Sequence, residues 1–257
     1  MIHDARPPEL ARIRDLLGLA NDAPYDLQRV AEEKCFGDGF EGHPHVRVFG
    51  DFEGIAVTCG KYLRILAVDR SRRGRGVGTA LLRDAESFGA AVIAAEPGNY
   101  FTPGVSEDLA KFFRKRGYAE TARTQNLIAA TTGEEQAASS EREKVLGFIE
   151  KTFGPIWRFE ASRGAKIFSV SDGNDIVGFS THEANNRGLG FFGPTGVAES
   201  HRGRGLGREL LLASLADLRR LGYDRAVIPW TDAIEFYRKT CGARFEHRFV
   251  ILRRKSG

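Results

Sequence analysis

The sequence has few cysteines and no long apolar run. Its 257 residues include only Cys35, Cys59 and Cys241, an odd number without CxxC or metal-ligand spacing. Such a set excludes a disulfide framework and favours a reducing cytoplasm without a metal site. No apolar stretch approaches the roughly 18 residues of a membrane helix, and Met1 to Asp4 does not begin a secretory signal. We therefore expect a cytoplasmic protein that is neither exported nor inserted in a membrane.

The sequence also lacks the pattern of a nucleic-acid-binding face. The formal net charge is only +4, and no aromatic side chains alternate with a basic stripe. Much of the positive excess lies in two short loops and in the tail from Arg253 to Lys255. This distribution predicts small-ligand chemistry and no nucleic-acid partner.

A turn rich in arginine and glycine occurs twice. The sequence Arg202-Gly203-Arg204-Gly205-Leu206-Gly207 has a counterpart, Arg73-Gly74-Arg75-Gly76-Val77-Gly78, 129 positions earlier. Alternate glycines let the backbone turn tightly, and each turn leads into a helical pattern whose first N–H groups can bind phosphate. The arginines, with Arg208, favour a diphosphate. Neither turn has the Gly-x-Gly-x-x-Gly dinucleotide pattern or the Gly-Lys-Ser/Thr of a P-loop.

The repeat predicts two domains, at 1–132 and 141–257. A linker of small and polar residues, from Thr131 to Ser140, is expected to join them. Two helices are expected to open the first half, at 9–19 and 26–35, whereas only one is evident in the second, at 145–153. Strands, turn and helices then follow in the same order in both halves, with expected strands at 46–49, 55–58, 62–68, 91–95, 122–130, 166–170, 176–182, 189–197, 225–229 and 245–252. These patterns predict an α/β (α+β) fold in duplicate, with mixed strands and helices on both faces.

The two turns resemble the pyrophosphate loop of the GNAT superfamily of acyl-CoA-dependent N-acetyltransferases. That loop reads Arg or Gln, two residues, Gly, one residue, then Gly or Ala. The resemblance covers most of both halves and implies two tandem GNAT-like domains with mostly antiparallel sheets and acetyl-CoA as co-substrate. It implies coenzyme contacts in the second half from Val197, Ala198, Glu199, Arg202, Gly203, Arg204, Gly205, Leu206, Gly207 and Arg208. The first-half counterparts are Val68, Arg73, Gly74, Arg75, Gly76, Val77, Gly78 and Thr79.

The resemblance also implies a general acid. In the family, a tyrosine on the helix after the fifth strand protonates the leaving thiolate, and Tyr237 in Phe236-Tyr237-Arg238-Lys239 matches it. The corresponding first-half stretch, 124 positions earlier, has Phe113, which has no proton to give. We therefore expect the second domain to be catalytic and the first to be catalytically degenerate. Tyr100 is an alternative phenol in the first half.

The general base has several candidates in the second half. Asp232, Glu183, His182 and Glu199 all lie near the ends of the strands that would surround the thioester. Asp232, with Glu235 three residues later, also reads as a helix capping box. Trp230 stands where the family commonly has an asparagine, so the pantetheine contacts there are open.

The most specific function that the resemblance implies is transfer of an acetyl group from acetyl-CoA to a primary amine of a small molecule, with an amino sugar favoured over a cysteinyl pseudodisaccharide. A non-catalytic acyl-CoA-binding or regulatory module remains an alternative, as does an acetyltransferase that acts on a protein amine. A third alternative is a protein or nucleic-acid partner recognised through the arginine and glycine loops. The protein is expected to be a monomer or a homodimer.

Overall fold

The protein divides into two compact units. The computed structural model describes residues 1–20, 22–132 and 141–255. Unit 1 contains Met1–Thr124 and the C-terminal segment from Arg248, and unit 2 contains Gln125–His247. The boundaries differ from the predicted ranges 1–132 and 141–257 because two strands, β6 (Tyr118–Ala130) and β11 (Arg244–Arg254), are each shared between the units. Most of the predicted linker, residues 133–140, lies outside the described residues.

Unit 1 is built on a mixed sheet with the strand order β1-β2-β3-β4-β5-β11-β6. The pairs β1–β2, β2–β3, β3–β4 and β5–β11 are antiparallel, whereas β4–β5 is parallel. The strands that lie wholly in this unit are β1 (Ile2–Asp4), β2 (His45–Phe49), β3 (Gly54–Cys59), β4 (Tyr62–Val68) and β5 (Val92–Ile93). The helices are η1 (Pro7–Glu9), α1 (Leu10–Ala20), α2 (Ala31–Phe36), η2 (Arg70–Arg72), α3 (Val77–Ser87) and α4 (Glu107–Arg114).

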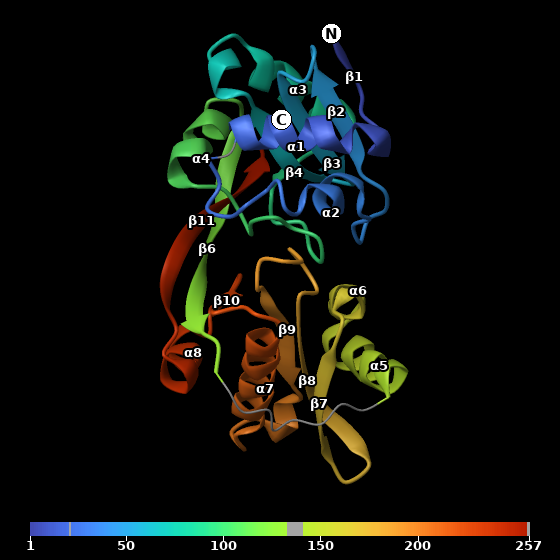
Figure 1. Ribbon diagram of the computed structural model, residues 1–257, viewed down its shortest axis with the longest axis vertical. Helices are drawn as coiled ribbons and strands as arrows, with labels where there is room; N and C mark the ends of the chain where they lie inside the picture. Colours follow the sequence, from blue (N-terminus) through green and yellow to red (C-terminus); the bar gives the residue numbers. More distant parts are fainter. Residues whose placement is uncertain (21, 133–140, 256–257) are drawn as a thin grey trace. The chain divides into compact units, whose positions relative to one another are not determined.

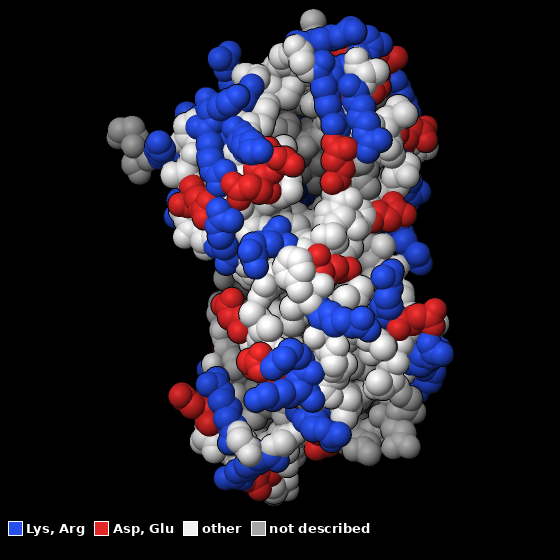
Figure 2. Space-filling model, turned by 90° about the vertical axis from the view of Figure 1, so that its left-hand side faces the viewer, with Lys and Arg blue, Asp and Glu red and all other residues white. Residues whose placement is uncertain are grey.

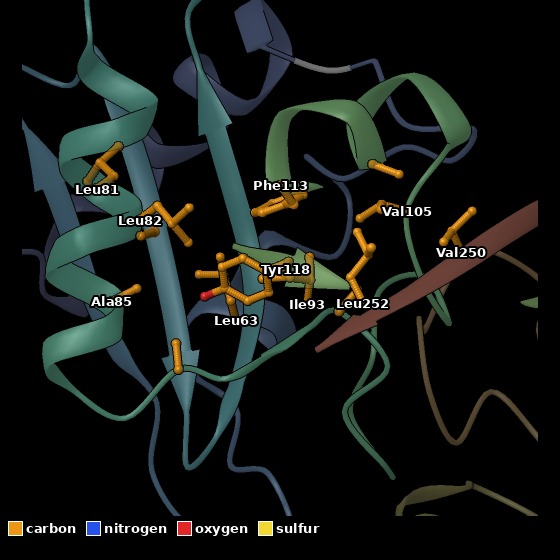
Figure 3. Packing of buried hydrophobic residues seen from close by; sticks show 14 of the residues in the cluster. Leu63, Leu81, Leu82, Ala85, Ile93, Val105, Phe113, Tyr118, Val250 and Leu252 are labelled. Atoms are coloured by element: carbon orange, nitrogen blue, oxygen red, sulfur yellow. The ribbon is translucent and has the colours of Figure 1, made fainter. Parts of the chain in front are cut away.

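The core of unit 1 holds α3, which follows the first glycine turn, and α4, which packs beside it. Leu81 and Leu82 of α3 and Phe113 of α4 pack on strand residues that include Leu63 and Tyr118 (Figure 3). All of these side chains are 2% exposed or less, and burying each stabilises the fold by about 1.5–3 kcal/mol. The turn and α4 are therefore held on one rigid sheet.

Unit 2 repeats the order of helices and strands that unit 1 shows from α1 onward. Its antiparallel sheet has the order β7-β8-β9, and β10 pairs antiparallel with the end of β6. A parallel bridge from Phe191 to Val227 links the start of β9 to β10. The elements are α5 (Arg142–Phe153), α6 (Pro155–Arg163), β7 (Ile167–Asp172), β8 (Asp175–His182), β9 (Phe192–Val197), η3 (Glu199–His201), α7 (Leu206–Arg220), β10 (Arg225–Ile228) and α8 (Ile234–Cys241) (Figure 1).

The predicted mixed α/β fold with mostly antiparallel strands is confirmed. The main differences from expectation concern four elements. The strand expected at 91–95 covers only Val92–Ile93, because Ala94 and Ala95 have positive φ. Strand β1 was not expected, the second helix begins at Ala31 instead of Asp26, and unit 2 has a second helix, α6. Gly154, where φ is 97°, ends α5 and separates it from α6. Helix α6 buries only Ala161, so its apolar periodicity is weak. Within the described residues, no helix has the length and apolar character needed to span a membrane.

Candidate functional site

The two glycine turns have nearly identical backbone geometry. Gly76 and Gly205 are the N-caps of α3 and α7 in the left-handed region, with φ of 85° and 84°. Gly74 and Gly203 also have positive φ, of 74° and 80°. A β-carbon at any of the four would meet no atom within 4 Å, so the backbone conformation, and not crowding, favours glycine. The first N–H groups of each helix lack helical acceptors, so both turns are suited to bind an anion.

The third glycine of each turn lies beneath an aromatic ring. A β-carbon at Gly78 would lie 3.6 Å from Phe112 Cζ, and one at Gly207 would lie 3.5 Å from Phe236 Cζ. Both rings come from the helix that follows the short strand, α4 or α8. The alignment of Phe112 with Phe236, and therefore of Phe113 with Tyr237, has a structural basis in this shared contact.

Several loop arginines are held by groups of the protein itself. The Nε atoms of Arg73 and Arg202 donate to the carbonyl oxygens of Val68 and Val197, at 3.1 and 3.4 Å, and so tie each turn to the preceding strand. Arg73 also pairs with Asp22. The charge that these arginines offer a ligand is therefore smaller than the sequence suggests.

In unit 2, a carboxylate likewise faces the turn. Asp172 Oδ2 lies 3.1 Å from Arg204 Nη1 and 3.2 Å from His201 Nε2. Arg208, on the first turn of α7, is exposed. Arg208 therefore offers its charge to solvent or to a ligand at the helix N-terminus.

Unit 1 has a cleft of about 1040 Å³ beside its turn. The walls are the end of α1 with the segment after it, the end of β4, the turn with the start of α3, and α4. Of the predicted first-half coenzyme residues, the cleft is lined by Val68, Arg73, Gly74, Gly76, Val77, Gly78 and Thr79, but not by Arg75. Figure 2 shows Lys and Arg side chains, together with Asp and Glu side chains, around a hollow in the face of unit 1. Apolar walls with arginines at the edge suit a ligand that has a phosphate group and a less polar arm.

Tyr237 lies in the core of unit 2, with 7% of its surface exposed. Its ring packs among Leu211 and Leu215 of α7 and Phe192 of β9. Burial raises the pKa of Tyr237 above its ordinary value of 10.0, and the nearby Cys241 raises it further. The phenol is therefore fully protonated at neutral pH. The structure brings Phe236, and not Tyr237, against the glycine turn.

Glu183 is engaged within its own loop. Its Oε1 accepts hydrogen bonds from the N–H groups of Gly190 and Phe191, at 2.8 and 3.2 Å, and Oε2 accepts from Gly188 N–H and, at 2.9 Å, from the Tyr223 hydroxyl. Glu183 itself has a φ of 52°. These contacts give the carboxylate a structural role that its sequence position did not reveal.

Asp232 is exposed and does not cap α8. The predicted capping box is wrong: the N-cap residue is Ala233, its N–H donates to Thr231 Oγ1 at 3.1 Å, and Glu235 pairs with Arg238. The helix begins one residue later than the box requires, so Asp232 lies before the N-cap position.

The other candidates differ in burial. His182 is buried, and its Nε2 lies 2.8 Å from Asp217 Oδ2, whereas Glu199 is exposed next to the turn. Tyr100, the alternative phenol of unit 1, is only 5% exposed. Phe113 is 1% exposed, with its ring against Tyr118. The catalytic and coenzyme assignments stay predictions.

One cleft residue was missed in the sequence. Arg116 follows α4, lines the cleft, and hydrogen-bonds Thr79 Oγ1 at the start of α3. If the alignment of Phe112 with Phe236 is continued along the sequence, Arg116 aligns with Thr240. This difference in charge between the two halves would have pointed to Arg116.

Comparisons with known proteins agree with this geometry. Residues 135–243 match the profile of the acetyltransferase (GNAT) family. No curated protein matches the sequence. Among solved structures, a GCN5-related glucosamine N-acetyltransferase region of a fungal multi-domain GH3 beta-N-acetylglucosaminidase has a TM-score of 0.75 and 18% identity. That match covers 98% of this chain but 38% of the fungal protein, which is therefore much longer.

Two further structures match over nearly the full length of both chains. A GCN5-related N-acetyltransferase from Sphaerobacter thermophilus has a TM-score of 0.66 and 16% identity, with coverage of 99% of this chain and 95% of that one. A tandem GNAT protein from the clavulanic acid biosynthesis pathway has a TM-score of 0.67 and 15% identity, with coverage of 98% and 97%. The profile match covers residues 135–243, and the structural matches show that the chain has the fold of these GNAT proteins over nearly its whole length.

Proposed function

We propose that the protein is an acetyl-CoA-dependent N-acetyltransferase built from two tandem GNAT-like units, acting on a primary amine of a small molecule. The observation that carries this proposal is the repeated left-handed glycine N-cap, at Gly76 and Gly205, with free helix amides beyond it. These amides would bind the diphosphate of the coenzyme, and the end of the preceding strand would bind its pantetheine arm.

Unit 2 is the proposed catalytic unit. Val197, Ala198 and Glu199 would hold the arm by their backbone, and residues 202–208 would hold the diphosphate. The neutral amine nitrogen would form a bond to the thioester carbonyl carbon and lose one proton to a base, while the C–S bond breaks and Tyr237 gives its proton to the departing thiolate. Tyr237 is protonated at neutral pH, as this role requires, although burial raises its pKa and so makes the phenol a weaker acid.

The base would be Asp232 or a water relay. Asp232 is exposed close to the start of α8, whereas the Glu183 carboxylate already accepts four hydrogen bonds. An amine with a pKa of about 7.7–8.0 is partly neutral near pH 7.5 and needs little help. A lysine-like amine near 10.4 would depend on the carboxylate.

Unit 1 is proposed to bind coenzyme without turnover, since Phe113 stands where Tyr237 stands in unit 2. For the acceptor we favour an amino sugar, a choice supported by likeness to the fungal glucosamine N-acetyltransferase region. A cytoplasmic location is supported by three free cysteines, Cys35, Cys59 and Cys241.

The test is thiol release from acetyl-CoA across a panel of amines that includes glucosamine, amino acids and a lysine peptide. We expect one class of small amine to stimulate release well above hydrolysis, and acetylated product to be found by mass spectrometry. Intact CoA binding with no stimulation by any amine would instead identify a binding module. Stimulation by the lysine peptide alone would move the acceptor to a protein amine.

A further inference from the structure

The arginines that line the unit-1 cleft are not equivalent. Arg72 faces Glu53 at 3.3 Å, and Arg73 pairs with Asp22. Asp108, the other acidic residue of the lining, pairs with Lys111. Among the described residues, Arg116 has no carboxylate partner. Among the arginines that line the cleft, Arg116 is therefore the one whose guanidinium group does not contact a carboxylate of the described residues.

The Arg116 side chain is held in a fixed position. Its guanidinium carbon lies 3.7 Å from the centre of the Phe112 ring. Nε and Nη2 donate to Thr79 Oγ1 at 3.1 and 2.8 Å, and Nη1 donates to the Phe112 carbonyl oxygen at 2.8 Å. A guanidinium has five N–H donors. Two of the five thus have no acceptor within the described part of the chain. Because the side chain is already held in one conformation, it would lose little conformational entropy when a ligand binds.

The position of Arg116 selects the kind of ligand. Thr79 is the third residue of α3, so the guanidinium lies next to the unpaired N–H groups of Val77 and Gly78. Helix amides and a guanidinium fork that converge in one cleft are complementary to phosphate oxygens. The apolar wall of Phe112, Leu109 and Val105 would accept a less polar extension.

We propose that Arg116 is the phosphate anchor of the unit-1 cleft, and that its ligand is the diphosphate of an acyl-CoA. This proposal rests on the proposed function and deepens it: unit 1 is a working coenzyme site with an anchor of its own, not a remnant.

The second unit supplies an independent argument. By the alignment that the aromatic contacts support, Thr79 corresponds to Arg208 and Arg116 corresponds to Thr240. Each unit therefore has one arginine and one threonine at this pair of positions, exchanged between the two helices. The exchange keeps one guanidinium beside each helix N-terminus.

The experiment measures hydrogen–deuterium exchange in the full chain during a CoA titration. Peptides that cover 73–87 report unit 1, and peptides that cover 202–220 report unit 2. In the unaltered protein we expect CoA to protect both. Arg116→Ala should raise the CoA concentration for half protection of 73–87 by roughly 10- to 150-fold, the range expected for a hydrogen bond to a charged group. Protection of 202–220 should not change.

Arg114→Ala is the matched control. Arg114 is the last residue of α4, two positions before Arg116, but it pairs with Glu107 and Glu120 and is not part of the cleft lining. This variant should bind CoA as the unaltered protein does. The exchanged variant Thr79→Arg with Arg116→Thr copies the unit-2 arrangement and should recover most of the lost affinity, even if Arg116→Ala alone proves unstable.

Two results would overturn the proposal: an unchanged midpoint for 73–87 in Arg116→Ala, or no protection of 73–87 by CoA in the unaltered protein. Failure of the proposed function has a different signature, namely no protection of 202–220 or no amine-dependent thiol release. The two can therefore fail separately.

Discussion

Tyr237→Phe is the most informative single change, because it separates a catalytic from a structural role for the phenol. The substitution removes one hydroxyl from a side chain that is 7% exposed and leaves the ring in the core. A structural role alone predicts the loss of at most one hydrogen bond of the hydroxyl, which costs about 0.5–1.5 kcal/mol of unfolding free energy. The general-acid role predicts in addition a fall in kcat of about 10²- to 10⁴-fold.

That fall corresponds to about 2.7–5.4 kcal/mol in the barrier, well above the stability effect. The assay is steady-state thiol release with the best amine, alongside urea unfolding and CoA binding by calorimetry. CoA affinity should stay nearly constant, because Phe236, and not Tyr237, faces the glycine turn.

Tyr118→Phe is the matched control, since Tyr118 is 1% exposed and its hydroxyl lies 3.0 Å from Glu86 Oε1 in the core of unit 1. It should lose similar stability and keep its kcat. If Tyr237→Phe behaves like this control, the general-acid assignment fails.

The pH dependence gives a second readout of the same assignment. A general acid works only while protonated, and burial raises the pKa of Tyr237 above 10.0. Activity should therefore show no alkaline decline from this group up to at least pH 10. A loss of kcat between pH 8 and pH 9 would point to another acid.

Three further changes test the structure around the sites. Gly205→Ala should lower the unfolding free energy, measured in urea, by about 1–2 kcal/mol and weaken CoA binding, because φ is 84° at this position. The control is Gly147→Ala, in an exposed helical position, which should not destabilise the protein. Glu183→Gln should cost about 1–3 kcal/mol in urea unfolding with little change in kcat, and the opposite pattern would make Glu183 the base. Glu96→Gln leaves the buried Arg64 without its carboxylate and should cost about 3–5 kcal/mol by thermal unfolding; a loss under 1 kcal/mol would contradict a tightly coupled pair.

Much of the fold could be predicted because its signals are local. The segment from Tyr62 to Val68 is a short, mostly apolar run that follows the turn at Gly60. Ser106 precedes α4 and caps it by accepting from Leu109 N–H. Helix α6 and strand β1 were missed because each buries too little apolar surface to set a period.

The sites were harder to predict, because their contacts join residues far apart in sequence. Nothing local to Glu183 reveals that three backbone N–H groups and Tyr223 surround its carboxylate. Asp232 with Glu235 has the letters of a capping box, but the chain enters α8 at Ala233. Arg116 was hidden for the same reason, since its partner Thr79 is 37 positions away.

The last strand has a consequence for how the chain is made. Leu252 and Arg253 pair with Ile93 and Val92, and Val250 exchanges hydrogen bonds with Val105, so unit 1 needs residues that are translated after all of unit 2. Unit 2 is contiguous from Gln125 to His247 and has all of its residues before that point. During synthesis, the half that is translated first would be the half that closes last, and until then its β5 edge stays open on the nascent chain.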